Sequence, residues 1–281
     1  MCKYTTVYTI VDDFCKIYEE WVSHKLISSN KQRNRSGKLT LAEMLSIMIF
    51  YHFSPYKNFK AYYRYFITNS TLFKNPPCYE RFIQIIPSLF LPLMVMVHYL
   101  SGKQTGYYYV DSTHFAVCKN IRIMNHKTFK GLAARGHSSI GWFYGFKLHM
   151  IINHKSEIVA VKITKGNRDD RKAFEAMVIK KDLKGKCYAD KGYISKDLLT
   201  GLHKRGLTLI TGIKRNMKNY LIPILDKILL RKRFIIETIF SYIKEHFNIR
   251  PNKHRSPTNF FVSLLSALIA YQLKPSKPQI S

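Results

Sequence analysis

Three acidic residues lie at positions where carboxylates could share divalent cations. Asp111 ends a run of strand-forming residues, and Asp190 ends a second, shorter run of the same kind. Glu237 lies in a long helical pattern that must pack against the same sheet. Three clustered carboxylates would repel one another, and two hard cations such as Mg²⁺ would remove that repulsion. Because paired metal ions can activate a water or a 3′-hydroxyl against a phosphodiester, the acids predict metal-dependent phosphoryl chemistry.

Each acid taken alone also has an ordinary structural interpretation. The sequence Asp111-Ser112 is typical of a turn at a strand end. In the helical pattern, Arg233 precedes Glu237 by four residues and Lys244 follows it by seven, so all three share one face. That face is either a surface salt-bridge ladder of little energetic value or a metal-binding carboxylate between two phosphate-binding cations. The chemical interpretation therefore depends on the three acids meeting in space.

The charge of the chain indicates a polyanionic partner. Its 281 residues include 46 Lys and Arg against 17 Asp and Glu, a formal net charge of +29. A compact chain with this excess repels itself unless it meets a polyanion. The charge is spread along the sequence among 19 Tyr and 18 Phe. This pattern favours a broad DNA- or RNA-binding surface over an anionic membrane.

Cysteine usage and hydropathy favour a cytoplasmic location. The five cysteines are odd in number and far apart, with no Cys-x-x-Cys pair or zinc-ligand spacing, so we expect reduced thiols. The N-terminus has no signal-peptide pattern. The most apolar run, residues 82–100, is interrupted by Gln84, Pro87, Pro92 and His98. We expect a pair of core helices there and no contact with a membrane.

The first third of the sequence predicts an all-helical N-terminal domain, residues 1–103. Apolar residues recur at three- and four-residue steps, and Thr40 with Glu43 forms the capping pattern of a second helix. A basic loop at residues 31–38 separates the first two helices. A DNA-binding domain and a plain helical lid fit this pattern equally well, because no helix-turn-helix signature decides between them.

Residues 104–270 predict a mixed five-stranded sheet flanked by helices. Three strands form a meander and two more are joined by crossover helices, an order typical of a ribonuclease H-like α/β fold. A basic connector is expected at residues 119–136, a long helix at about 226–248, and a flexible basic tail at 271–281. The strands are expected near residues 107–111, 141–153, 158–163, 186–190 and 207–213.

Two long motifs are the most specific in the chain: GWFYGFKLH at residues 141–149 and DKGYIS at residues 190–195. Shorter ones are VDS at 110–112, FKG at 129–131, GNRDDR at 166–171, LRKRFIIET at 230–238, HRS at 254–256, DDFC at 12–15 and YERF at 79–82. With these motifs the sequence resembles the DDE transposases of bacterial insertion sequences, most closely the insertion-sequence family nine-eight-two. The likeness covers nearly the whole chain.

This resemblance implies that Asp111, Asp190 and Glu237 are a DDE triad, both catalytic residues and metal ligands. The implied cofactor is Mg²⁺, with Mn²⁺ as a substitute. The implied partner is double-stranded DNA, in the form of transposon-end inverted repeats and target DNA, bound by a homodimer in the bacterial cytoplasm and on the nucleoid. Two positions depart from the pattern of related transposases: Leu230 stands where they have Tyr, and His137 stands where a Lys is expected.

Basic residues near these motifs are the predicted DNA contacts, together with the N-terminal helices and the basic connector. We expect their binding to weaken steeply with salt, because phosphate contacts release counterions. The individual residues are Arg233, Lys244, Lys191, Lys130, Lys147 and Arg255.

Other polar residues have simpler interpretations. Asp169-Asp170 opens a helical pattern, where acids cap the helix more often than they bind metal. Glu245 is the one rival acid on the long helix, and it falls outside the Arg-x3-Glu-x6-Lys spacing. His114 and His149 are expected in hydrogen-bonded or DNA-facing positions, because Mg²⁺ prefers oxygen ligands.

Three functions are compatible with the sequence, and the resemblance favours a DNA transposase. A structure-selective nuclease or junction resolvase could share the sheet and the acids, and would cleave branched DNA whatever its terminal sequence. A non-catalytic DNA-binding or repressor protein would bind without dependence on Mg²⁺. A tyrosine recombinase with Tyr193 as nucleophile is disfavoured, because the Arg/His constellation which that chemistry needs is not evident.

Overall fold

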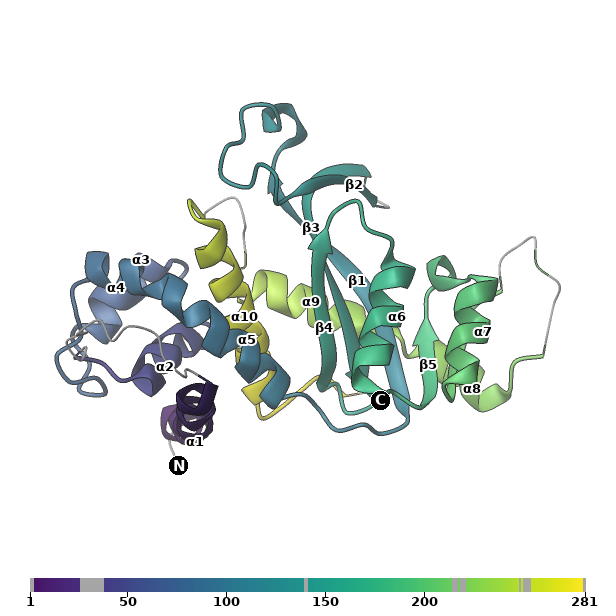
Figure 1. The fold of residues 1–281 in the computed structure, drawn as a ribbon, viewed down its shortest axis with the longest axis horizontal. Coiled ribbons are helices and arrows are strands. Elements are labelled where there is room, and N and C mark those ends of the chain that lie inside the picture. Colours follow the sequence, from purple (N-terminus) through teal and green to yellow (C-terminus); the bar gives the residue numbers. More distant parts are fainter. Residues whose placement is uncertain are drawn as a thin grey trace. The chain divides into compact units, whose positions relative to one another are not determined.

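The computed structural model describes residues 3–25, 38–138, 141–213, 217, 221–247, 249 and 254–279 (Figure 1). The basic loop predicted at residues 31–38 lies outside these residues except for Lys38. The chain divides into two compact units. The helical unit consists of Met1–Leu100, His246–Ile249 and Ser256–Lys274, and the sheet unit of Ser101–Glu245, Arg250–Arg255 and Pro275–Ser281.

The helical unit has a well-defined start to its second helix. Thr40 Oγ1 accepts a hydrogen bond from Glu43 N at 3.2 Å, and Glu43 Oε2 accepts one from Thr40 N at 2.7 Å. The predicted capping box is thereby confirmed. The α-helices of this unit are α1 (Lys3–Lys25), α2 (Leu41–Tyr51), α3 (Phe59–Ala61), α4 (Tyr79–Ile85), α5 (Phe90–Tyr99) and α10 (Pro257–Leu273).

Helix α10 lies in the core of this unit. Nearly all of its residues from Phe260 to Tyr271 are buried, and Ser266 Oγ lies 2.9 Å from His52 Nε2. The sequence placed most of this segment in the catalytic domain, residues 104–270, so the division of the chain differs from the predicted one. The reason is the apolar surface of α10, which is nearly continuous around the helix and packs against α2 and α5.

One segment of the described residues, Tyr79–Tyr99, is long and apolar enough to cross a membrane, with 39% of its most apolar window buried. This is weak evidence for a span, because core helices of globular proteins pass the same test. A 3₁₀ turn at Ile86–Leu89, which contains Pro87, separates α4 from α5. The predicted pair of helices is thus confirmed.

The sheet unit contains a mixed sheet of six strands. Its strand order is β2-β3-β1-β5-β6, and β4 also pairs with β3. The β1, β2, β3 and β4 pairings are antiparallel, whereas β1, β5 and β6 run parallel. The mixed sheet was therefore predicted correctly. The strands are β1 (Tyr107–Cys118), β2 (Ala134–Ser138), β3 (Gly141–Asn153), β4 (Ile158–Lys165), β5 (Gly185–Ala189) and β6 (Leu207–Thr211).

The prediction of five strands was wrong, because β2 lies in the stretch expected to be a connector. Its sequence, ARGHS, has no apolar alternation, so its strand conformation depends on pairing with β3. A Cβ at Gly136 would lie 2.2 Å from Gly166 O, so the backbones approach there as only glycine allows. Strand β1 also continues past Asp111, because it pairs with β3 along nearly its whole length.

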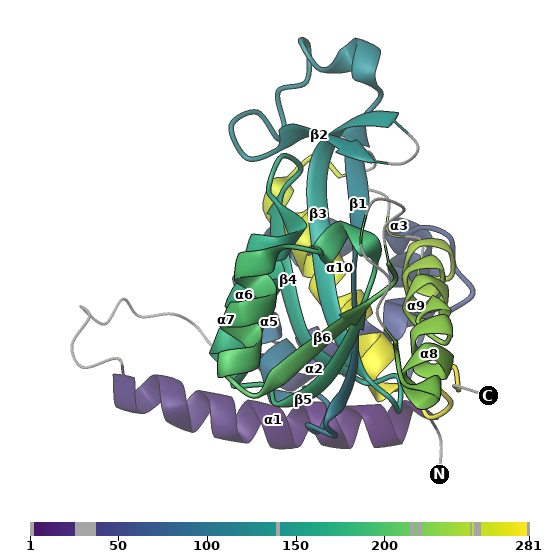
Figure 2. The same ribbon diagram turned by 90° about the vertical axis from the view of Figure 1, so that its right-hand side faces the viewer.

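Helices cover both faces of this sheet, as Figure 2 shows: α6 (Asp170–Lys181) and α7 (Lys196–Lys204) on one, α8 (Ile224–Arg231) and α9 (Phe234–Glu245) on the other. Alternate residues of β1 serve the two faces. Tyr108 and Val110 join the core formed with Phe174 of α6 and Leu202 of α7. Tyr109 and Asp111 therefore face α8 and α9. We call these the α6 face and the α9 face.

The C-terminal part of the sheet unit differs from its prediction in the long helix and in the tail. The single helix expected at 226–248 is two helices, because the basic run Arg231–Arg233 interrupts the apolar stripe between α8 and α9. The tail expected to be flexible makes a contact within the sheet unit, where Ser156 Oγ donates a hydrogen bond to Pro278 O at 2.6 Å.

Candidate active site

Strand register brings the first two predicted acids together. Parallel strands β1 and β5 pair Tyr109 with Tyr188. These two rings are 5.5 Å apart. Asp111 and Asp190 each lie two residues further along, so alternation places both on the α9 face. Asp190 directly follows β5, and its Oδ1 accepts a hydrogen bond from Lys191 N at 2.7 Å. The two carboxylates therefore extend from neighbouring strands on one face of the sheet.

Arg233 connects the third predicted acid to this pair. Its Nη1 lies 3.1 Å from Asp111 Oδ2, and its Nη2 lies 3.2 Å from Glu237 Oε1. The side chains of Arg233 and Asp111 are only 17% and 20% exposed. The guanidinium bridges a strand residue and a helix residue. Its pair with Asp111 is largely buried, whereas its pair with Glu237, whose side chain is 45% exposed, is a pair along one helix face.

The environment of Asp111 disfavours its ionised form. Burial raises the pKa of Asp111 to about 6 from an ordinary value of 3.8, and the charges of Glu237 and Asp190 act in the same direction. Arg233 and a hydrogen bond from Ser112 N, at 2.8 Å, act against this rise without cancelling it. Asp111 and Glu237 thus share one guanidinium, and the charge of Asp190 adds to the excess of negative charge near Asp111.

The donor set fits a hard divalent cation, but it is not assembled as a metal cage. Nowhere in the described part of the chain are three His, Cys, Asp or Glu side chains grouped closely enough to hold a metal ion. The expected convergence of three acids on shared ions is not what the structure shows, because Arg233 pairs with both Asp111 and Glu237. Carboxylate oxygens with surplus negative charge are nevertheless the ligands that Mg²⁺ prefers.

A second polar cluster lies on the α6 face, directly behind Asp111. Ser112 Oγ donates a hydrogen bond to Asp170 Oδ2 at 3.1 Å, and Lys147 Nζ donates one to Asp170 Oδ1 at 2.8 Å. The Nδ1 atom of the fully buried His149 lies 3.8 Å from the same Oδ1. Here one carboxylate is matched by one ammonium group and by hydrogen bonds.

The role of Asp170 was missed by sequence reasoning, which treated Asp169-Asp170 as helix caps. Asp169 is confirmed as the N-cap of α6, since its Oδ1 accepts a hydrogen bond from Arg171 N at 2.9 Å. Asp170 is instead held against the sheet. A usable signal was present in β3, where Lys147 and His149 are alternate polar residues in an otherwise apolar and aromatic run.

The two histidines singled out earlier are part of the packed interior or its edge. His149 Nε2 lies 2.8 Å from Thr164 Oγ1, and burial lowers the pKa of His149. His114 stacks on Phe143 with ring centres 4.6 Å apart, and burial lowers its pKa also. The expectation of a hydrogen-bonded core position is confirmed for His149.

The six basic residues predicted to contact DNA have different environments. Lys244 is half-buried with Nζ 5.4 Å from the centre of the Phe115 ring, and burial lowers its pKa. Arg233 and Lys147 are paired with acids. Since Lys147 faces Asp170, its ammonium group serves the α6-face cluster. The other three are exposed: Lys130, Lys191 and Arg255.

Comparison with known families gives one extensive match. Residues 101–257 match a family model described as the transposase DDE domain. This span covers more than half of the chain and contains Asp111, Asp190 and Glu237. No curated protein matches the sequence.

Solved transposase structures share a distant likeness with the chain. A piggyBac transposase in a synaptic complex with hairpin DNA is 10% identical, with a TM-score of 0.43 over 73% of this chain and 49% of that one. A Mos1 transposase paired-end complex with the left transposon end is 9% identical, with a TM-score of 0.24 over 69% and 66%. A pre-cleavage Mos1 transpososome is 10% identical, with a TM-score of 0.26 over 93% and 88%. The chain spans about half the length of the piggyBac chain that it matches.

Proposed function

The chain belongs to the transposase DDE domain family, and we propose that it is a DNA transposase of the insertion-sequence type. In this proposal it binds transposon-end inverted repeats, cleaves a DNA strand there and transfers the freed 3′-hydroxyl to target DNA. The observation that carries the proposal is the cluster in which Arg233 bridges Asp111 and Glu237, with Asp190 on the neighbouring strand.

Each member of this cluster has a role in the proposal. Asp111 and Asp190 would hold divalent metal ions from two adjacent strands, and Glu237 would complete the site from α9. Mg²⁺, or Mn²⁺ in its place, would supply the charge that activates the attacking oxygen and stabilises the leaving one. A ribonuclease H-like topology agrees with the observed arrangement of a meander followed by parallel strands.

Arg233 has two proposed states in this scheme. Without metal it neutralises part of the charge of Asp111 and Glu237, as the structure has it. If divalent cations held the acids, the Arg233 guanidinium would be free to bind a DNA phosphate with its two-pronged donor geometry. The residue would thereby hold Asp111 and Glu237 in position in the absence of metal.

The remaining parts of the proposal concern partners and location. A formal net charge of +29 supports double-stranded DNA as the substrate. We propose that the helical unit contributes to binding the transposon ends, that the protein acts as a homodimer on DNA, and that it works in the bacterial cytoplasm on the nucleoid. On the motifs of the sequence, we also propose that the chain belongs to the insertion-sequence family nine-eight-two.

The test is strand cleavage with a matched pair of glutamate variants. The substrate is a plasmid that carries both ends of the element, incubated with Mg²⁺ or Mn²⁺. Glu237→Gln should abolish cleavage while DNA binding is retained. Glu245→Gln, on the same helix, should cleave like the wild type, because Glu245 only accepts a hydrogen bond from Ser241 Oγ at 3.1 Å. Equal cleavage by both variants would refute the assignment.

A branched-DNA control separates transposase from general nuclease. A transposase should cut the plasmid at the element's ends and leave a four-way junction without those ends intact. Cleavage of the junction at an equal rate would favour a structure-selective nuclease. Binding without any product in either metal would favour a non-catalytic DNA-binding protein.

A further inference from the structure

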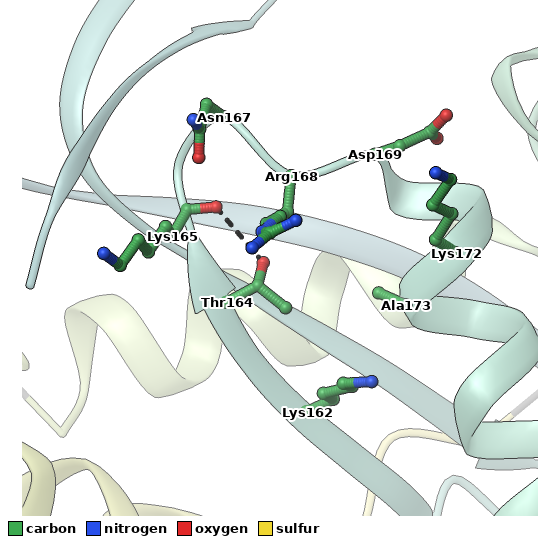
Figure 3. A pocket seen from close by; sticks show the side chains of 8 residues that line it. All are labelled: Lys162, Thr164, Lys165, Asn167, Arg168, Asp169, Lys172 and Ala173. Carbon is green, nitrogen blue, oxygen red and sulfur yellow. Dashed lines mark hydrogen bonds between the residues drawn. The ribbon is translucent and has the colours of Figure 1, made fainter.

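A basic pocket lies on the α6 face of the sheet unit and has no part in the function described so far. It has a volume of about 540 Å³ and lies between the end of β4 and the first turn of α6. Figure 3 shows its side chains, which come from both elements and from the turn between them. They are Lys162, Thr164, Lys165, Asn167, Arg168, Asp169, Lys172 and Ala173.

The charge of this pocket is strongly positive. Four of its eight residues are cations, and Asp169 is the one acid. That acid is already neutralised, because its Oδ2 lies 2.7 Å from Arg171 Nη2 outside the pocket. In the described part of the chain, no carboxylate pairs with Lys162, Arg168 or Lys172, and all three are exposed. Like charges held together in a hollow are unfavourable unless an anion joins them.

The turn that shapes the pocket is firmly held. Gly166 N donates a hydrogen bond to Gly145 O at 2.9 Å, and a Cβ at Gly166 would lie 2.6 Å from Ala134 O. The Arg168 carbonyl accepts a hydrogen bond from Lys147 Nζ at 3.1 Å. The backbone on both sides of Arg168 is therefore fixed by the sheet, and its guanidinium is presented from a rigid support.

The donors of the pocket match a phosphate group. An arginine offers a planar fork for two oxygens, lysines add point charges, and the Asn167 amide adds a neutral donor. Ala173 is the one apolar residue of the lining, so the groups that could orient a ligand are polar or charged. Its chemistry selects a compact polyanion.

We propose that this pocket binds phosphate groups of the DNA backbone, at a position separate from the reacting phosphodiester. The proposal rests on the proposed function as a DNA transposase. It adds a second DNA contact on the α6 face, whereas the Asp111 cluster lies on the α9 face of the same sheet. The pocket adjoins Asp170 of α6 and Lys147 of β3, which hydrogen-bonds the Arg168 carbonyl, and Asp170 accepts a hydrogen bond from Ser112 of β1, the residue after Asp111.

The test is the salt dependence of duplex binding by the full-length chain. The pocket variant is the triple substitution Lys162→Ala, Arg168→Ala and Lys172→Ala. The control is the triple Lys180→Ala, Lys204→Ala and Arg205→Ala, which removes the same charges from exposed positions on α6, at the end of α7 and directly after it. If the pocket holds two to three phosphates, the slope of log Kd against log salt should fall by roughly 2 to 3 in the pocket variant. The control should keep nearly the wild-type slope.

Several results would overturn the inference. Equal losses in both triples would mean that only net charge matters, and an unchanged slope in the pocket triple would exclude phosphate contacts there. The single variant Arg168→Lys guards against misfolding: it keeps the charge but should weaken binding, because the fork is lost. Thermal melting of each variant confirms the fold.

Two further experiments are needed. One distinguishes DNA phosphate from free polyphosphate as the ligand, and the other distinguishes failure of the pocket inference from failure of the proposed transposase function. Calorimetry with inorganic pyrophosphate tests a free polyphosphate: micromolar binding that the pocket triple abolishes, with DNA binding unchanged, would overturn the DNA assignment. If the pocket triple binds DNA like the wild type while Glu237→Gln still abolishes cleavage, the pocket inference fails and the proposed function stands. If the wild type does not bind duplex DNA at all, both fail.

Discussion

Asp111 of β1 and Asp170 of α6 lie on opposite faces of the same sheet. The two carboxylates differ in the balance of charge around them. Asp111 shares a single guanidinium with Glu237, close to the charge of Asp190. Asp170 has its own ammonium group, Lys147, at 2.8 Å and a hydrogen bond from the neighbouring Ser112. One cluster has acids in excess, and the other is balanced.

In the Asp111 cluster the acids outnumber the basic groups, whereas in the Asp170 cluster acid and base are matched. The balanced cluster satisfies its carboxylate with protein donors and holds β1, β3 and α6 together. The unbalanced cluster leaves Asp111 with a pKa raised to about 6, because burial penalises its charge. A divalent cation would relieve the first imbalance, whereas it would have to compete with Lys147 in the second. In the proposed function, chemistry therefore belongs to the Asp111 cluster and structural support to the Asp170 cluster.

The largest expected difference between the clusters is in activity. Asp111→Asn should reduce the rate of DNA cleavage by a factor on the order of 10³ or more, because it removes a proposed metal ligand. Asp170→Asn should reduce it by roughly tenfold, since it acts only through the position of β1. Single-turnover cleavage of end DNA measures both. Comparable losses in the two variants would erase the distinction.

In their effect on stability the two clusters should rank in the opposite order, with the Asp170 cluster more sensitive. Asp170→Asn should lower the free energy of unfolding by about 2–4 kcal/mol, because Lys147, whose side chain is 16% exposed, loses its ion pair in a buried setting. Urea titration of the metal-free protein measures this. The control is Asp197→Asn in α7, which should stay within about 0.5 kcal/mol of the wild type. An unchanged free energy of unfolding in Asp170→Asn would mean that the Asp170 cluster does not stabilise the fold.

Sequence could predict the acids but not the balance of charge around them. Asp111 and Asp190 were identifiable because each follows a strand-forming run, and parallel pairing of such strands aligns their ends. The spacing of Arg233 and Glu237 predicted that they share a helix face, and their ion pair at 3.2 Å confirms it. Asp170 was missed because its partners, Ser112 and Lys147, are brought to it by the register of β1 and β3, which a single sequence does not encode locally.

The same reasoning explains the errors in the fold. Strand β2 has no apolar alternation, so pairing with β3 determines its conformation. The break between α8 and α9 falls where the basic run Arg231–Arg233 interrupts the apolar stripe, and the pattern on both sides of it is helical, so one long helix was expected. Local patterns such as the Thr40 capping box were predicted correctly, since their donors and acceptors are three residues apart.

Removing the basic residue of each cluster should cause a smaller loss of stability, and only in the Asp111 cluster should that loss depend on metal. Arg233→Gln should lower the free energy of unfolding by about 1–2 kcal/mol without metal, because the acids lose their shared partner. Millimolar Mg²⁺ should restore most of this loss. Lys147→Gln should be destabilised to the same extent with or without Mg²⁺. Thermal melts with EDTA or Mg²⁺ compare them, and rescue of both variants or of neither contradicts the account.

The smallest expected effect is a dependence on pH. In the metal-free protein the folded pKa of Asp111, about 6, exceeds its ordinary value of 3.8, so ionisation costs more in the folded than in the unfolded chain. Its contribution to stability therefore falls as pH rises from about 4 to above 6. Asp111→Asn escapes this loss and should be more stable than wild type by about 1 kcal/mol at pH 8.

At pH 4 the two proteins should be equally stable, because the carboxyl is then protonated in the folded chain. At pH 8 the gain in stability of Asp111→Asn over wild type is smaller than the pKa shift of Asp111 alone implies, since Arg233 loses one of its two acidic partners in the variant. A variant less stable than wild type at pH 8 would show that the Arg233 ion pair outweighs the burial of Asp111.

The central claim is tested most directly by locating Mn²⁺ in crystals through its anomalous scattering. The account predicts a peak within coordination distance of Asp111 and Asp190, with the Arg233 side chain displaced from its contact with Asp111 and no peak at Asp170. A peak beside Asp170, or Arg233 still bridging Asp111 and Glu237 with no Mn²⁺ bound to any of the three acids, would contradict it.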